Sequence, residues 1–108
     1  MTILDKIVER KKEEVAEAKA KVTNDELKSY PLFNRTCYNL RESILHPERS
    51  GIIAEYKRAS PSKGLINGRN SVQEVVKGYQ DAGASAISVL TDKDFFQGDL
   101  QDLTAARE

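Results

Sequence analysis

Glu55 and Lys57 are the side chains of this sequence best suited to acid–base chemistry. They lie two residues apart in a segment that begins apolar at Ile52 and Ile53 and then becomes ionic. Successive side chains of a strand point to opposite faces, so a carboxylate and an ammonium group with this spacing share one face. We expect the two groups to lie within hydrogen-bonding distance, where each keeps the other charged. A surface ion pair worth about 0–1 kcal/mol explains the same residues, and the residues alone favour that simpler interpretation.

The segment from Arg58 to Asn70 is the second place where chemistry is expected. It follows the strand directly and contains Ser60-Pro61-Ser62. Links between a strand and a helix usually run about 2–6 residues, and longer ones are often functional. Three basic residues in it would attract an anionic ligand, although turn hydroxyls bonded to nearby backbone and solvated charges explain the segment equally well. These basic residues are Arg58, Lys63 and Arg69.

Hydrophobic periodicity predicts the elements that must position these groups. In chain order they are helices over residues 3–21 and 26–29, a helix that ends before Pro47, a strand over 52–57, a helix over 72–82, a strand over 86–91 and a helix from 100 onward. Their predicted N-caps are Thr2, Asp25, Asn34 or Thr36, Ser71 and Asp99. A strand, a helix and a second strand in this order predict a parallel pair joined by a right-handed crossover.

One face of the predicted strand pair can pack on the crossover helix, whereas the other face has no partner in the sequence. The first face comprises Ile52, Ala54, Ile87 and Val89, and the second comprises Ile53, Glu55, Lys57, Ser88 and Leu90. Parallel strands normally have both faces covered, and two strands leave two open edges. We therefore expect either a longer fold around these strands or association with another chain.

Composition excludes several classes of function. The formal net charge is zero, with 17 residues of each sign, so no nucleic-acid partner is expected. No apolar run approaches the roughly 20 residues of a membrane span, no signal peptide is recognisable, and no cluster of metal ligands is present. Cys37 is the only cysteine, which excludes an intramolecular disulfide and favours a reducing, cytoplasmic location. We predict neither a metal nor a cofactor.

Two blocks of the sequence resemble one family of enzymes. Ile52 to Gly64 is similar to the first barrel strand and loop of indole-3-glycerol-phosphate synthase, and Gly83 to Gly98 is similar to that family's second strand and loop. The start of the chain resembles the family's extra leading helix. The resemblance implies an α/β fold, the N-terminal part of a (β/α)8 TIM barrel, which needs about 250 residues. It divides the chain into a helical extension over 1–50 and two βα units over 51–108, with most of the barrel wall absent.

The resemblance also implies an activity and a set of site residues. The family closes the indole ring of 1-(2-carboxyphenylamino)-1-deoxyribulose 5-phosphate with loss of CO2 and water, in tryptophan biosynthesis. Glu55 and Lys57 match its catalytic positions. Its substrate-binding positions match Ser60, Pro61, Ser88, Leu90 and Phe96. The family's principal general acid, a lysine on the third strand, and its phosphate-binding loops have no counterpart here, so the 108-residue chain alone is predicted to be inactive.

Two other interpretations stay open. Another phosphate-handling barrel of the same pathway is compatible with the fold, and a non-catalytic module would use the uncovered strand face to self-associate. The expected partner of the enzyme is a phosphorylated small molecule. A monomeric full enzyme and a self-associating 108-residue chain are both compatible with the sequence.

Overall fold

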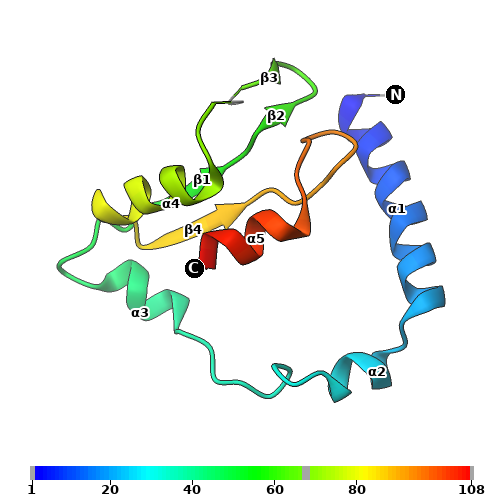
Figure 1. The fold of residues 1–108 in the computed structure, drawn as a ribbon, viewed down its shortest axis with the longest axis horizontal. Coiled ribbons are helices and arrows are strands. Elements are labelled where there is room, and N and C mark those ends of the chain that lie inside the picture. Colours follow the sequence, from blue (N-terminus) through cyan, green and yellow to red (C-terminus); the bar gives the residue numbers. More distant parts are fainter. Residues whose placement is uncertain (1, 67–68, 108) are drawn as a thin grey trace. The chain divides into compact units, whose positions relative to one another are not determined.

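A computed structural model describes residues 2–66 and 69–107 of the chain (Figure 1). The chain divides into two compact units, Met1–Tyr38 and Asn39–Glu108. The first unit holds α1 (Ile3–Lys21) and α2 (Asn24–Ser29). The second holds α3 (Leu40–Leu45), β1 (Ile53–Tyr56), β2 (Ala59–Ser60), β3 (Gly64–Leu65), α4 (Val72–Asp81), β4 (Ala86–Val89) and α5 (Leu100–Arg107). The predicted residues of the candidate site therefore all belong to the second unit.

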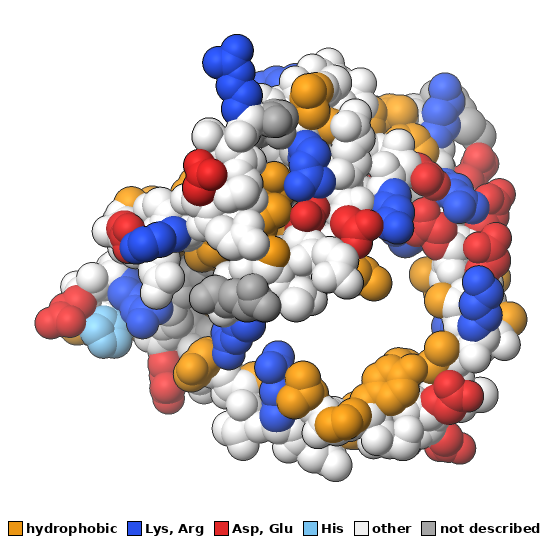
Figure 2. Space-filling view, in the orientation of Figure 1, with side chains coloured by type: hydrophobic (Ala, Val, Ile, Leu, Met, Phe, Trp, Pro, Cys, Tyr) orange, Lys and Arg blue, Asp and Glu red, His pale blue; other side chains and the backbone are white. Residues whose placement is uncertain are grey.

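The long helix α1 has the predicted bounds and buries none of its residues. It begins with a capping box, in which the Thr2 hydroxyl accepts a bond from the Asp5 amide and the Asp5 carboxylate accepts one from the Thr2 amide. Ion pairs such as Arg10–Glu13 run along it, and Figure 2 shows acidic and basic side chains interspersed on this helix. Exposed pairs of this kind contribute little to stability. Capping and helix propensity, rather than burial, therefore stabilise α1 within its unit.

The two short helices begin at other residues than predicted. Thr23 caps α2 by accepting a bond from a first-turn amide at 3.1 Å, so Asp25 lies inside the helix. Asn39 caps α3 in the same way at 3.0 Å, and neither Asn34 nor Thr36 does so. A cap must have an extended backbone directly before the first helical turn. Several polar residues near each helix have suitable side chains, and only the backbone path selects one of them.

The strands β1 and β4 form the predicted parallel pair, and α4 is the crossover helix between them. In the register of this pair Glu55 lies opposite Ser88 and Tyr56 lies opposite Val89. Both strands are shorter than predicted, because the chain leaves the ladder soon after Tyr56 and Val89. The Ser71 hydroxyl caps α4 as predicted, accepting a bond from the backbone of the first turn at 3.1 Å.

The core of the second unit lies between this strand pair and its helices. It consists of Tyr56, Val72 and Val76, and partly buried residues of α4, β4 and α5 pack around it. The prediction that Ile52 faces the crossover helix is wrong, because Ile52 is 60% exposed. It precedes the first paired residue of β1, and Tyr56, which is only 2% exposed, fills the inward position at the other end of the strand.

The loop after β1 contains a small antiparallel hairpin that was not predicted. In it Ala59 of β2 pairs with Leu65 of β3, and Ser60 pairs with Gly64. Gly64 has a φ of 63°, a conformation that glycine adopts without the steric cost borne by other residues. Two-residue strands carry no hydrophobic periodicity, so a sequence pattern cannot reveal them. The hairpin gives the first part of the loop a fixed backbone path.

Candidate functional site

Glu55 lies on the exposed side of β1, and Lys57 follows the last residue of the strand. Ile53, Glu55 and Lys57 are exposed, whereas Ala54 and Tyr56 are turned toward the core and are more buried. The open face of the strand pair therefore carries Glu55, and the shared face of Glu55 and Lys57 stays a prediction.

The expected contact between these two groups is absent. No ion pair or hydrogen bond joins Glu55 to Lys57 within residues 2–66 and 69–107; instead, Oε2 of Glu55 accepts a bond from Oγ of Ser88 at 3.1 Å. Residues two apart on a strand are separated by about 6.6 Å along its axis, and an exposed ion pair gains too little to bring such side chains together. Ser88 lies directly opposite Glu55 in the parallel register, which makes it the nearer partner.

Ser88 thus contacts a predicted catalytic residue, a role that sequence reasoning did not assign to it. It is half-buried, and its hydroxyl group donates to a carboxylate that is otherwise exposed. A donor placed in this way restricts the rotamers of the carboxylate. The position of Ser88 in β4 is therefore suited to orienting Glu55.

The other residues predicted to bind substrate lie in the loops that follow β1 and β4. Ser60 is buried, and its hydroxyl accepts a bond from the Lys63 amide at 3.3 Å, which is ordinary turn chemistry. Pro61 is exposed at the turn of the hairpin. Leu90 and Phe96 are half-buried, and the Leu90 amide extends the ladder beyond β4. None of these four side chains forms a hydrogen bond with Glu55 among the described residues.

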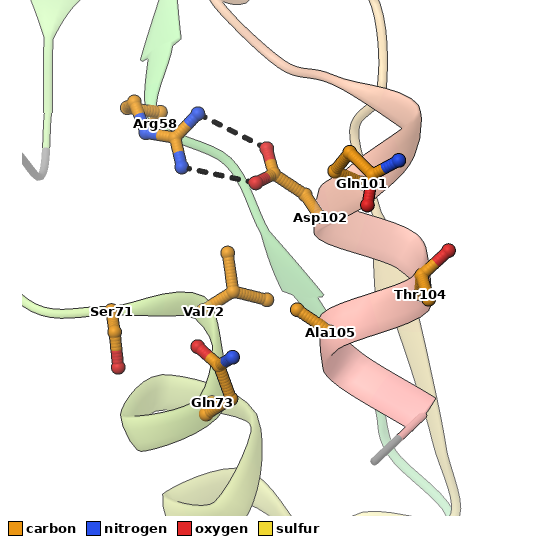
Figure 3. A pocket seen from close by; sticks show the side chains of 8 residues that line it. All are labelled: Arg58, Ser71, Val72, Gln73, Gln101, Asp102, Thr104 and Ala105. Atoms are coloured by element: carbon orange, nitrogen blue, oxygen red, sulfur yellow. Dashed lines mark hydrogen bonds and ion pairs between the residues drawn. The ribbon is translucent and has the colours of Figure 1, made fainter.

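Arg58 is not the solvated loop cation that the sequence suggested. Its Nη1 and Nη2 atoms donate to the two carboxylate oxygens of Asp102 at 3.0 and 3.2 Å (Figure 3). Nη1 also donates to the carbonyl of Gln97 at 2.8 Å, and the guanidinium lies 5.8 Å from the centre of the Tyr56 ring. The hydrogen bond to Asp102 raises the pKa of Arg58 above its ordinary value. Arg58 is therefore a structural cation, held at the end of β1.

A hollow of about 460 Å³ lies between the first turns of α4 and α5, next to this ion pair (Figure 3). Both polar and apolar side chains line the hollow: Arg58, Ser71, Val72, Gln73, Gln101, Asp102, Thr104 and Ala105. Both helices pack on the core that lies on the Tyr56 side of β1. The hollow is thus on the side of the sheet opposite Glu55, and it is not part of the predicted site.

Asp99 and Asp102 form the predicted start of α5. Oδ1 of Asp99 accepts a bond from the Gln101 amide at 2.9 Å, and Oδ2 of Asp102 accepts one from the Asp99 amide at 3.2 Å. Two aspartate side chains therefore cap the start of α5, each accepting a bond from a different first-turn or N-cap amide. The spacing of the two residues revealed the cap in the sequence. It did not reveal that Asp102 also binds Arg58, since that partner lies 44 positions away.

We expect the charge of Asp99 to make the stability of the second unit depend on pH. The bond from the Gln101 amide, followed by the one from Lys93, lowers the pKa of Asp99 below its ordinary value. A carboxylate whose pKa is lower in the folded state stabilises the fold above its unfolded pKa of about 3.9, and that contribution is lost as the pH falls through the folded value. Asp99→Asn keeps a side-chain oxygen that can cap α5 but removes the charge. It should therefore lower the melting temperature more at pH 7 than at pH 3.

Circular dichroism melts of the 108-residue chain at both pH values measure this difference. Asp25→Asn in α2 is the matched control, because it makes the same chemical change at an exposed residue of the other unit. An equal effect of Asp99→Asn at pH 7 and at pH 3 would show that the charge on Asp99 contributes nothing.

Residues 2–66 and 69–107 include no group of three or more His, Cys, Asp or Glu side chains that could hold a metal ion. In the same residues, no helix has the length and apolar character needed to cross a membrane.

Comparison with known proteins identifies the family. The model of the family described as Indole-3-glycerol phosphate synthase matches residues 4–108. An indole-3-glycerol phosphate synthase of Bacillus cereus is 49% identical over 107 residues, which are 99% of this chain and 39% of the relative. One from Bacillus mycoides is 48% identical over 106 residues, which are 98% of this chain and 38% of the relative. The chain therefore spans about 39% of the length of such curated relatives. Since the match includes both parallel strands and the helical first unit, the chain belongs to the indole-3-glycerol phosphate synthase family.

Proposed function

We propose that this chain forms the first two strands of a (β/α)8 barrel that works as an indole-3-glycerol-phosphate synthase. The barrel would close the indole ring of 1-(2-carboxyphenylamino)-1-deoxyribulose 5-phosphate with loss of CO2 and water. The observation that carries the proposal is the family match over residues 4–108. Residues 1–50 would be a helical extension and residues 51–108 the beginning of the barrel; this boundary stays a prediction.

The two faces of the strand pair support the proposal of a barrel wall. α4 and α5 pack on one side of it, around the core of Tyr56, Val72 and Val76. The other side carries Ile53, which is 52% exposed, and the exposed Glu55. In a (β/α)8 barrel the helices lie outside, side chains from every strand fill the interior, and the active site lies at the carboxyl ends of the strands. Glu55 would then lie at the mouth of the barrel, next to the loops that carry Ser60 and Phe96.

The chemistry of the reaction suits the two ionisable residues on this side. Lys57 would bind the anionic substrate or protonate its ketone oxygen, and Glu55 would act as acid and base when the hydroxyl group leaves. Ser60, Pro61, Leu90 and Phe96 would line the substrate site. The hydroxyl group of Ser88 would orient Glu55, in keeping with the hydrogen bond between them. These roles extend the family positions residue by residue and require no metal ion or cofactor from this chain.

A chimera tests the proposal directly. It consists of residues 1–108 of this chain followed by the remainder of the Bacillus cereus relative, and we call it the joined protein. We expect the joined protein to convert the substrate, measured by the fluorescence of the indole product, and to support growth of a synthase-deficient bacterium without tryptophan. A well-folded joined protein without turnover, beside an active Bacillus cereus enzyme, would contradict the proposal.

The 108-residue chain by itself should behave differently. We expect no measurable turnover, because the third-strand lysine expected to be the principal general acid lies outside it.

We also expect it to self-associate, since β1 and β4 are the only strands of their sheet in the described residues and the face with Ile53 is open. Light scattering at several concentrations measures the second effect. A monomer at all concentrations, or turnover free of contaminating full-length enzyme, would overturn the corresponding expectation.

A further inference from the structure

Asp102 and Arg58 together connect the end of β1, the loop after β4 and the start of α5. The carboxylate oxygens of Asp102 accept two bonds from Arg58 at the end of β1 and one from the backbone amide of Asp99, which caps α5. Arg58 in turn donates to the carbonyl of Gln97, at the end of the loop that follows β4. The side chain of Asp102 is 13% exposed and that of Arg58 is 30% exposed. The contact is thus a partly buried junction between the loops after β1 and β4.

Resting on the function proposed above, we infer that Asp102 is a positioning residue for the reaction. It acts through Arg58, which stands between Lys57 and the buried Ala59. The Arg58 carbonyl accepts a bond from the Ile66 amide at 2.8 Å, so both its backbone and its guanidinium are held. Because both the backbone and the guanidinium of Arg58 are held, the chain follows a single path there. That path places Lys57, which precedes Arg58, and Ser60, which follows it.

The geometry of the Arg58–Asp102 pair favours a positioning role over simple attraction between charges. Two parallel N–H···O bonds between a planar guanidinium and a carboxylate fix orientation as well as distance, which a single point charge does not. Figure 3 shows the two groups facing each other beside the first turns of α4 and α5. This is the side of β1 opposite Glu55, and Asp102 therefore influences the reaction without touching the substrate.

Variants of the joined protein test the inference. We expect Asp102→Ala and Arg58→Ala each to lower kcat/KM about 10–100-fold, because a displacement of about 1 Å in a site can cost that much. The double variant should be no worse than Arg58→Ala alone, since Asp102→Ala then removes a link that is already lost. Asp99→Ala is the matched control: it removes the other side-chain cap of α5, on the Gln101 amide, but leaves the bonds between Arg58 and Asp102. It should keep kcat/KM within about twofold at a comparable loss of melting temperature.

Two results would overturn the inference while leaving the proposed function intact. One is an Asp102→Ala variant that loses no more kcat/KM than Asp99→Ala does at the same decrease in melting temperature. The other is a double variant whose fold-loss of kcat/KM equals the product of the losses in the two single variants. Hydrogen exchange of the loop amides gives a readout that does not need turnover. Asp102→Ala should speed exchange at Lys63 and Ile66, Asp99→Ala should not, and unchanged exchange in Asp102→Ala would refute the link even if the joined protein were inactive.

Discussion

Glu55→Gln in the joined protein should lower kcat by about 10²–10⁴-fold, the range typical of removing a general acid or base. KM should change little, because the amide keeps the size of the side chain and still accepts a bond from Ser88. Glu55 is exposed on the open side of β1, where no core packing depends on it. We therefore expect the variant to stay folded, so that the lower kcat reports the lost acid–base group. Steady-state kinetics measured by indole fluorescence, together with a melting curve, separate the loss of catalysis from loss of fold.

Two further variants sharpen this prediction. Glu48→Gln makes the same chemical change at an exposed residue before β1 and should leave kcat unaltered. Ser88→Ala should lower kcat in the unmodified joined protein but add nothing in the Glu55→Gln background, because its hydroxyl would act through Glu55. If Glu55→Gln kept more than half of the original kcat, Glu55 would have no acid–base role. If Ser88→Ala raised KM equally in both backgrounds, Ser88 would contact the substrate instead.

Gly98→Ala should destabilise the second unit by about 1–3 kcal/mol or more, the cost of forcing extra atoms into a packed site. A Cβ atom at Gly98 would lie 2.2 Å from the carbonyl oxygen of Leu90 and 2.9 Å from the carbonyl carbon of Thr91. Both are backbone atoms, so no side-chain rotation relieves the clash. The Gly98 amide also donates to the carbonyl of Asp92 at 2.7 Å, and this bond would break if the loop moved away.

Urea unfolding of the 108-residue chain, followed by circular dichroism, measures the effect. Gly78→Ala is the matched control, because Gly78 lies within α4 and a Cβ atom there would meet nothing within 4 Å. Alanine is the better helix former by about 0.8–1.0 kcal/mol, so the control should be more stable than the original chain. Equal unfolding midpoints for Gly98→Ala and the original chain would show that the loop adapts without cost.

Local patterns in the sequence were sufficient for α1, for α4 and for the order of the two parallel strands. The apolar stripe of α4, its Ser71 cap and the two strand segments predicted the parallel pair that the structure contains. The side of β1 that carries Glu55 was also predictable, because strand alternation needs only neighbouring residues. Each of these features depends on residues close together in the chain, and their signals therefore survive without knowledge of the fold.

Contacts between distant residues were decided by the tertiary structure alone. Ser88 meets Glu55 because the register of β1 and β4 places them opposite each other. Arg58 meets Asp102 because α5 packs against the same core as α4. A charged or hydroxyl side chain is compatible with many partners, and its own sequence neighbourhood does not rank them. The sequence by itself determined which chemical groups the site offers, whereas packing of the strand pair and its helices determined which of those groups touch.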